Sequence, residues 1–439
     1  MKAGRSNLGW LLVVNAAYAL AALVGWPYYL FLLATRRKYR SHCWQRWGLV
    51  PRFPPGAKRL WVHAISVGEV EAARTFVPAL AEAFPDHEIV ISTTTMTGRE
   101  RALRLFPDRP VFHFPLDLWP CVAAALRRVR PTAVIQVESE WWPNFFLLAR
   151  RRGIPLVVVN LRMTEHGQRG YRRIRSLMRA VINSCTAVGV QAALYTDRLI
   201  SLGVDPERIR VTGQMKHDGV RFADTVEGAD ALRAEMKIEP DEPVLVAGST
   251  GPGEEAVLLE AFREVRKWHP PARLVVVPRR PETFDATAEA ILRADLGVRR
   301  RSTGEWSGSK RFPPVLLGDT MGEMLKWYAL ADIVFVGRSL VPVGGSNPME
   351  PGALGKPLLW GPHMFNFPIE APALLEVGAA RVVTDAAGLV AAVDELLTRP
   401  AQCRQMGEAA RATIRSLQGA TRRSVDLVRE ALGGLRTRP

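Results

Sequence analysis

Cysteine is scarce in this sequence of 439 residues. The four cysteines, Cys43, Cys121, Cys185 and Cys403, lie far apart and form no C-x-x-C pair. This spacing argues against both a disulfide framework and a zinc site, and it fits a reducing compartment. No internal repeat is evident, and the hydrophobic content of 48% is that of a packed globular protein. At this length we expect two or three domains.

Acidic residues are absent from the first 68 residues, which hold ten of the 59 lysines and arginines. Residues 8–35 carry no charge of either sign. About twenty apolar residues are enough to cross a bilayer as a helix, and the run is too long for a typical signal peptide. We therefore predict that residues 1–45 form a single membrane anchor, a transmembrane helix with a basic collar. Pro27 leaves a kink or a re-entrant hairpin open, and the pattern does not decide whether the segment spans the bilayer or lies in it.

The basic residues after the apolar run indicate an orientation and a partner. The heavier positive flank consists of Arg36, Arg37, Lys38 and Arg40. This flank predicts that the rest of the chain lies on the cytoplasmic side of the inner (plasma) membrane, where it would contact anionic lipids. The net charge of +16 could also attract nucleic acid. No nucleic-acid motif accompanies the charge, so membrane contact is the simpler explanation.

From residue 59 onward, apolar runs typical of strands alternate with amphipathic runs typical of helices. This order predicts an α/β protein with two Rossmann-like domains that face each other across a cleft. The predicted domains are residues 46–218 and 243–439, joined by a polar linker over 219–242. The second domain closes with C-terminal helices, the last a long one from about 401 to 432. Residues 299–311 are predicted to form an exposed basic loop.

A glycine-rich loop between two predicted strands occupies residues 337–367. The order of strand, loop, short helix and strand places backbone N–H groups where they can bind a phosphate. Three residues also have the spacing of a helix capping box, Asn347, Pro348 and Glu350. A cap would explain these three, but it does not explain Gly344 and Gly345, where the backbone must turn sharply or admit another group. Both explanations stay open at this point.

Charged residues follow several predicted strands, at the edge where parallel sheets bind ligands. Glu69 lies in the turn after the first strand, where it can act as a general base or simply complement a helix N-terminus. Glu138 and Glu140 end a later strand. The cations at strand ends, Lys216, Arg279 and Arg280, suit phosphate oxygens, although each taken alone is more often a surface charge.

Eight motifs follow one another along the chain. They are WVHAISVGEVEAA (61–73), STTTMTGRERA (92–102), FPLD (114–117), VESEWWPN (137–144), TGQMKHD (212–218), VPRRPE (277–282), GDTMGEM (318–324) and GRSLVPVGGSNPMEP (337–351) with GPHMFNF after it. In this order they resemble the membrane-anchored 3-deoxy-D-manno-octulosonic acid (Kdo) transferases of lipopolysaccharide assembly, over nearly the whole chain.

The resemblance implies a GT-B glycosyltransferase that moves Kdo from CMP-Kdo to a lipid A precursor of the lipid IVA type, without a cofactor. Glu69 falls on the general base of the family. Glu138 and Lys216 fall on positions that stabilise the transition state. The contacts with CMP would come from Pro278, Arg279, Met321, Gly322, Glu323, Asn347, Pro348, Met349 and Glu350.

No two aspartates have the spacing D-x-D, so a divalent cation at the donor phosphate has no obvious ligands and no metal site is predicted. Ser346 stands where the family commonly has His, and Thr164 stands where Ser is usual, which leaves donor and acceptor contacts open. Two alternatives remain. One is a related membrane-anchored glycosyltransferase with another nucleotide sugar or acceptor, and the other is a catalytically idle nucleotide-binding scaffold.

Overall fold

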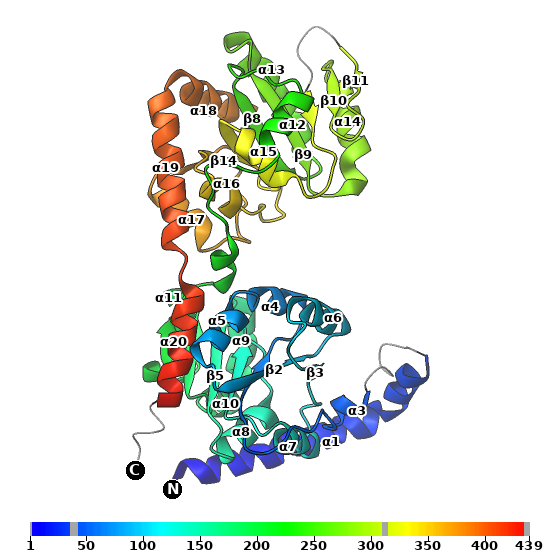
Figure 1. Cartoon of the computed structure of the whole chain (residues 1–439), viewed down its shortest axis with the longest axis vertical. Coiled ribbons are helices and arrows are strands. Elements are labelled where there is room, and N and C mark those ends of the chain that lie inside the picture. The colour runs from blue at the N-terminus through cyan, green and yellow to red at the C-terminus, as the bar shows by residue number, and fades with distance from the viewer. Residues whose placement is uncertain (1, 36–42, 310–314, 434–439) are drawn as a thin grey trace. The chain divides into compact units, whose positions relative to one another are not determined.

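The computed structural model describes residues 2–35, 43–309 and 315–433. The chain forms two compact units (Figure 1). Unit 1 comprises Met1–Gly219 and Gln418–Pro439, and unit 2 comprises Val220–Leu417. Each unit is a Rossmann-like sheet with helices, which confirms the predicted pair of α/β domains.

Unit 1 is built on a 7-stranded parallel sheet in the order β3-β2-β1-β4-β5-β6-β7. Its strands are β1 (Lys58–His63), β2 (His87–Thr93), β3 (Val111–His113), β4 (Ala133–Val137), β5 (Leu156–Leu161), β6 (Ala187–Val190) and β7 (Ile209–Val211). Strands β4, β5 and β6 are buried along their whole length, as expected when helices cover both faces of a parallel sheet.

Helices cover this sheet and extend beyond it. They are α1 (Lys2–Thr35), α3 (Cys43–Arg46), α4 (Val67–Ala72), α5 (Phe76–Ala83), α6 (Met96–Leu105), α7 (Trp119–Val129), α8 (Pro143–Arg151), α9 (Glu165–Arg173), α10 (Arg175–Ile182), α11 (Ala193–Ser201) and α20 (Ala420–Gly433), with 3-10 turns η1 (Pro206–Arg208) and η2 (Met215–Gly219).

Unit 2 is built on an 8-stranded sheet in the order β11-β10-β12-β9-β8-β13-β14-β15, in which the β10–β11 pair is antiparallel. Its strands are β8 (Val244–Thr250), β9 (Arg273–Pro278), β10 (Val298–Arg300), β11 (Trp306–Ser307), β12 (Val315–Leu317), β13 (Ile333–Val336), β14 (Leu358–Trp360) and β15 (Ala380–Val382). Its helices are α12 (Ala229–Glu235), α13 (Glu255–Trp268), α14 (Phe284–Arg293), α15 (Met324–Leu330), α16 (Met349–Ala353), α17 (Glu370–Glu376), α18 (Ala386–Thr398) and α19 (Pro400–Ser416), with the 3-10 turn η3 (Pro281–Thr283).

The end of the chain differs from the predicted long helix over 401–432. Two helices, α19 and α20, replace it, because the chain breaks at Gly419, whose φ of 88° is left-handed. The carboxylate of Asp218 accepts hydrogen bonds from Gly419 N at 2.6 Å and Thr421 N at 2.5 Å, which fixes the start of α20. The last helix therefore packs in unit 1, whereas the sequence places all residues after 243 in the second domain.

The predicted linker over 219–242 is also different, since most of it packs in unit 2. Helix α12 lies within it, and its Ala229 and Leu232 are buried in the core of unit 2 together with Met236 and Ile238. Apolar residues at these spacings close one face of the second sheet, so the polar character of the segment belongs to its outer face only.

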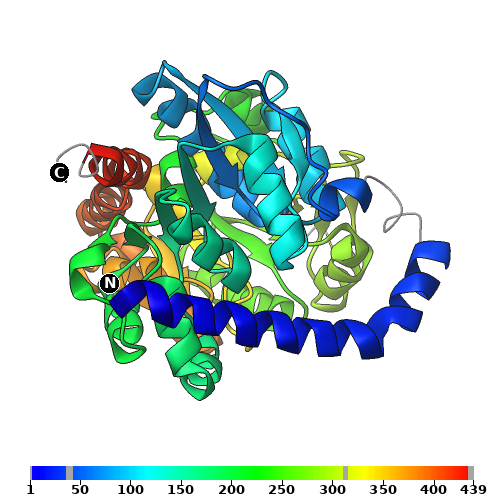
Figure 2. The ribbon, with the colours of Figure 1, turned by 90° about the horizontal axis from the view of Figure 1, so that it is seen from below.

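Helix α1 covers the predicted anchor at 8–35 and lies along α8 and α10 of unit 1 (Figures 1 and 2). Leu11 and Val14 are buried, whereas Leu12, Val13 and Leu23 are exposed. Within the described residues, no helix combines the length and the apolarity needed to cross a bilayer, so the predicted transmembrane helix is not supported. The predicted basic residues at 36–40 lie outside the described residues.

Candidate active site

Glu69 lies in the first turn of α4, directly after the first strand of unit 1. Ser66 is the N-cap of this helix, and its Oγ accepts a hydrogen bond from Gly68 N at 3.3 Å. Glu69 Oε2 accepts from Ser66 N at 2.9 Å and also from the Ser66 hydroxyl, which completes a capping box. The other oxygen, Oε1, has no hydrogen bond among the described residues. Glu69 therefore complements the helix N-terminus with one oxygen and leaves the second available.

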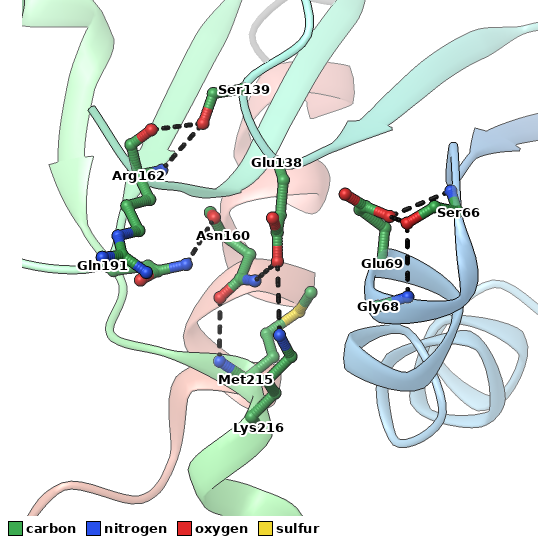
Figure 3. Close-up of polar contacts among 10 residues, drawn as sticks. All are labelled: Ser66, Gly68, Glu69, Glu138, Ser139, Asn160, Arg162, Gln191, Met215 and Lys216. Atoms are coloured by element: carbon green, nitrogen blue, oxygen red, sulfur yellow. Dashed lines mark hydrogen bonds and ion pairs between the residues drawn. The ribbon is translucent and has the colours of Figure 1, made fainter. Parts of the chain in front are cut away.

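Glu138 directly follows β4 and has a left-handed backbone with φ of 65°. Its N–H donates to Val159 O at 2.9 Å, which fixes this conformation against β5. Its Oε1 accepts from Asn160 Nδ2 at 3.3 Å and lies 3.8 Å from Lys216 Nζ. Figure 3 shows these contacts, with the carboxylate of Glu69 turned toward Glu138. The structure therefore brings together the three residues predicted as catalytic.

Carboxylates outnumber cations in the group formed by Glu69, Glu138 and Lys216. Burial raises the pKa of Glu138, and the charge of Glu69 raises it further, against the opposing effects of Lys216 and Arg162. Burial also raises the pKa of Glu140, again with a contribution from Glu69. Burial and the nearby charge of Glu69 thus disfavour ionisation of both Glu138 and Glu140.

Asn160 holds this group in place, and the sequence did not identify it. It is fully buried at 0% exposure, with a left-handed φ of 58°. Its Nδ2 donates to Glu138, its Oδ1 accepts from Met215 N at 3.0 Å, and its backbone carbonyl accepts from Gln191 Nε2 at 2.9 Å (Figure 3). One side chain thus ties the end of β4 to the residue before Lys216. The only local signal was a polar residue at the end of an apolar strand.

Unit 2 contains a cavity of about 460 Å³ beside its glycine-rich loop. Six of the nine residues predicted to bind CMP line it, namely Pro278, Arg279, Met321, Gly322, Asn347 and Glu350. Phe367 and Arg338 contribute to the same lining. Arg279 is exposed at the end of β9, where its guanidinium is available to an anion. Glu323, Pro348 and Met349 are not among the lining residues.

The loop that borders the cavity follows β13 and depends on glycine. Gly344 and Gly345 have φ of 96° and 78°, in the left-handed region. A Cβ on Gly344 would lie 2.4 Å from Asn366 Nδ2, and one on Gly345 would lie 2.3 Å from Met364 Sδ. The prediction of a sharp turn with close approach at these two residues is confirmed.

Glu254 anchors the start of this loop, and it is a second residue that the sequence did not identify. It is 0% exposed. Its carboxylate accepts four backbone hydrogen bonds, from Gly251 N at 2.9 Å, Arg338 N at 2.5 Å, Ser339 N at 2.8 Å and Leu340 N at 2.9 Å. One buried side chain therefore accepts hydrogen bonds from backbone N–H groups in both the turn after β8 and the turn after β13.

The capping box at Asn347, one of the two interpretations left open by the sequence, does not form. The N-cap of the short helix α16 is Pro348, and Asn347 Oδ1 accepts from Met349 N at 3.0 Å in a local turn. Glu350 does not reach back to the cap, because its side chain lines the cavity instead. Its carboxylate has no hydrogen bond or ion pair among the described residues. Burial raises its pKa, and Arg279 opposes this effect.

The carboxylate of Glu323 is hydrogen-bonded by neighbouring side chains and does not line the cavity. Its carboxylate accepts from Thr320 Oγ1 at 2.5 Å, Arg301 Nε at 3.0 Å and Lys326 Nζ at 3.1 Å. Burial acts to raise its pKa, but these three donors lower the pKa to about 2. The prediction of an exposed basic loop over 299–311 is partly wrong, because Arg300 and Arg301 form ion pairs with Asp319 and Glu323.

Ser346, the residue that departs from the family pattern, is buried against the sheet. Its Oγ donates to Ser249 O at 3.1 Å. It also lines the cavity, so its hydroxyl oxygen can still accept a hydrogen bond from a ligand. Within the described residues, no group of three His, Cys, Asp or Glu is arranged to hold a metal ion.

Comparisons with known proteins agree with the motifs. A family model described as 3-deoxy-D-manno-octulosonic-acid transferase (kdotransferase) matches residues 41–219. The 3-deoxy-D-manno-octulosonic acid transferase of Haemophilus influenzae is 34% identical over 90% of this chain and 92% of its own length. The enzyme of the same name from Bordetella pertussis is 33% identical over 86% of this chain and 89% of its own.

Solved structures agree on the fold. A glycosyltransferase from Rickettsia africae superposes with a TM-score of 0.56 at 14% identity, covering 88% of this chain and 100% of its own. A UDP-GlcNAc 2-epimerase from Neisseria meningitidis has a TM-score of 0.53 at 12% identity, covering 86% of this chain and 100% of its own. Because a transferase and an epimerase share this two-domain fold, the fold alone does not decide the chemistry.

Proposed function

The chain belongs to the 3-deoxy-D-manno-octulosonic acid (Kdo) transferase family, and from this we propose that it transfers Kdo from CMP-Kdo to a lipid A precursor. The observation that carries the proposal is the grouping of Glu69, Glu138 and Lys216 in unit 1. A protein that only bound nucleotides would have no use for a base among carboxylates of raised pKa.

Glu69 is the proposed general base. One of its oxygens is held by Ser66, which orients the carboxylate, and the other is available to accept the proton of an acceptor hydroxyl. The deprotonated oxygen attacks the anomeric carbon of Kdo while the bond from that carbon to the CMP phosphate breaks. Lys216 and Glu138 are proposed to stabilise the charge that develops in this transition state.

The cavity in unit 2 is proposed as the nucleotide site. Arg279 is a strand-end cation that suits the phosphate of CMP. Glu350, which has a free carboxylate in the lining, suits the hydroxyl groups of the ribose. Glu323 serves indirectly, because its bonds to Thr320 and Lys326 hold the segment that presents Met321 and Gly322.

A lipid acceptor requires access to a membrane surface, and α1 offers one. Its exposed apolar residues include Leu12, Val13, Leu20, Leu23 and Val24. We propose that this face lies on the cytoplasmic leaflet of the inner membrane without crossing it, with anionic lipids attracted by the basic N-terminal segment.

The proposal is tested by incubating the protein with CMP-Kdo and a tetraacyl lipid A precursor in detergent with EDTA, and by reading the product mass. A gain of one or more Kdo units is the expected result. No transfer, with CMP still bound, would overturn the proposed acceptor or sugar. Comparing CMP with UDP as competitors of the donor tests the alternative of another nucleotide sugar. Stronger competition by UDP than by CMP would favour that alternative.

The variant Glu69→Gln separates an enzyme from an idle scaffold. We expect transfer to fall by a factor of about 10² to 10⁴, because the amide cannot take up a proton, with CMP affinity unchanged. Thr164→Ser serves as the matched control, since the hydroxyl that caps α9 is kept and wild-type turnover is expected. An active Glu69→Gln variant would contradict the assignment of the base.

A further inference from the structure

Asp117, in the segment that follows β3, is a buried carboxylate outside the proposed chemistry. It is 6% exposed and lies at the N-terminus of α8. Its Oδ2 accepts from Asn144 N at 3.0 Å, its Oδ1 accepts from Phe145 N at 2.8 Å, and its backbone carbonyl accepts from Asn144 Nδ2 at 2.5 Å. Asp117 therefore holds the first turn of α8, whose N–H groups have no partner within the helix.

The first turn of α8 is directly connected to Glu138. Only residues 139–142 separate Glu138 from Pro143, where α8 begins. Trp142, the N-cap residue of α8, makes no side-chain cap of its own, so the external carboxylate of Asp117 substitutes for one. A shift of this turn would be transmitted along four residues to the left-handed backbone of Glu138.

Helix α1 contacts the same turn from the outside. Asn15 Nδ2 donates to Asn144 Oδ1 at 2.7 Å, and Asn15 Oδ1 accepts from Trp119 N at 3.2 Å and Asn144 Nδ2 at 3.3 Å. The hydroxyl of Tyr18 donates to Asp117 Oδ2 at 3.2 Å. These two side chains come from the face of α1 that also buries Leu11 and Val14.

We propose that α1 is a positioning element for the reaction. Asn15 and Tyr18, acting through Asn144 and Asp117, fix the first turn of α8 and thereby the position of Glu138. The inference rests on the proposed role of Glu138 in transfer. It gives the N-terminal helix a task in catalysis that is separate from contact with a membrane, since the two use different faces of the helix.

The test uses the full chain with Asn15→Ala and Tyr18→Phe combined. We expect kcat to fall about tenfold or more, because a small misplacement of a group that stabilises the transition state is costly. KM for CMP-Kdo should stay within twofold, since the donor cavity belongs to unit 2. General loss of stability would also lower the apparent kcat at constant KM, so kcat is referred to the folded fraction of each variant. Unchanged kcat in the double variant would overturn the proposal.

The matched control is Asn183→Ala, which removes another side chain that bonds to backbone in unit 1. Asn183 Nδ2 donates to Gly203 O at 3.0 Å, and its Oδ1 accepts from Asp205 N at 3.0 Å. This variant should lower thermal stability and leave kcat unchanged. An equal loss of kcat in the control would show that any weakening of unit 1 is enough, and this would also overturn the proposal.

Amide hydrogen exchange tests the same idea without activity. The N–H groups of Asn144 and Phe145 should exchange faster in the double variant than in the wild type and the control. If the wild type transfers no Kdo, the proposed function fails while this exchange result still stands. If exchange at these two residues is unchanged, the positioning by α1 fails whatever the activity.

Discussion

Asp117 and Glu138 in unit 1 and Glu323 in unit 2 lie in opposite electrostatic environments. In unit 1, burial raises the pKa of Asp117 to about 7 and raises the pKa of Glu138 above its usual range. In unit 2, hydroxyl and cationic donors outweigh burial and lower the pKa of Glu323 to about 2. A carboxylate already neutralised by arginine and lysine fixes structure, whereas one with few cations near it stays responsive to protons and to developing charge. The difference separates residues suited to chemistry from residues suited to support.

Glu350 is a unit 2 carboxylate that behaves like those of unit 1. Burial raises its pKa, and its oxygens have no partner among the described residues. Glu323 lies in the same unit but is held by three donors. The contrast within unit 2 therefore agrees with the contrast between the units, since the carboxylate left without partners is the one that lines the cavity.

The largest expected effect comes from Glu254, the buried support of the glycine-rich loop. Glu254→Ala leaves four backbone N–H groups without an acceptor, and each such group costs about 1–3 kcal/mol. We expect unit 2 to lose more than about 5 kcal/mol of unfolding free energy, so that it unfolds near room temperature while unit 1 stays folded. Pulse proteolysis with fragments assigned by mass measures both units.

The control for this variant is its neighbour. Glu255 accepts a hydrogen bond from Gly253 N at 3.0 Å, at a partly exposed position. Glu255→Ala should cost about 1 kcal/mol or less. Equal sensitivity of the two variants would show that Glu254 is not the support of the loop.

Sequence patterns predicted the elements well where the signal is local. The apolar runs after residue 59 predict strands such as β1 and β4, because a strand buried on both faces is apolar along most of its length. Three supporting residues, Asp117, Asn160 and Glu254, were not assigned roles. Asn160 and Met215 are 55 residues apart, and Glu254 and Ser339 are 85 apart, so no local spacing connects them.

Two outcomes concern local patterns. The capping box at Asn347 was one of two interpretations of the spacing, and it does not form, since the Glu350 side chain lines the cavity. The transmembrane helix was inferred from the long uncharged, apolar run over 8–35. Among the described residues no helix qualifies as a membrane span, and Asn15 and Tyr18 of that run bond to unit 1.

A second prediction concerns pH, which should change the stability of the two units in opposite directions. The pKa of Asp117 is raised on folding, so its protonated form stabilises unit 1 below about pH 4, and this stability is lost as the pH rises to about 7. One pKa unit corresponds to about 1.4 kcal/mol, so the loss is on the order of 3 to 4 kcal/mol. The pKa of Glu323 is lowered on folding, so its contribution to unit 2 is present above about pH 4.5 and is lost toward pH 2.

Neutral variants expose these opposite slopes. The unfolding free energy of Asp117→Asn, relative to the wild type, should rise between pH 4 and pH 7, measured for unit 1 by pulse proteolysis. That of Glu323→Gln, relative to the wild type, should rise as the pH falls below 4.5, measured for unit 2 by acid-stable denaturant titration. Slopes of the same sign would remove the electrostatic contrast between the units.

The smallest expected effect is kinetic, and it separates chemistry from binding by one pair of matched substitutions. Glu138→Gln removes the charge beside Lys216 and should lower kcat about 10²-fold, with little change in KM for CMP-Kdo, because transition-state interactions act on kcat. Glu350→Gln removes a charged acceptor from the cavity and should raise KM about tenfold, since a hydrogen bond to a charged group contributes about 1.5–3 kcal/mol. Steady-state kinetics with varied donor measures both. If Glu138→Gln raised KM and Glu350→Gln lowered kcat, the division of work between the two carboxylates would be reversed, and unit 1 would have to supply part of the donor site.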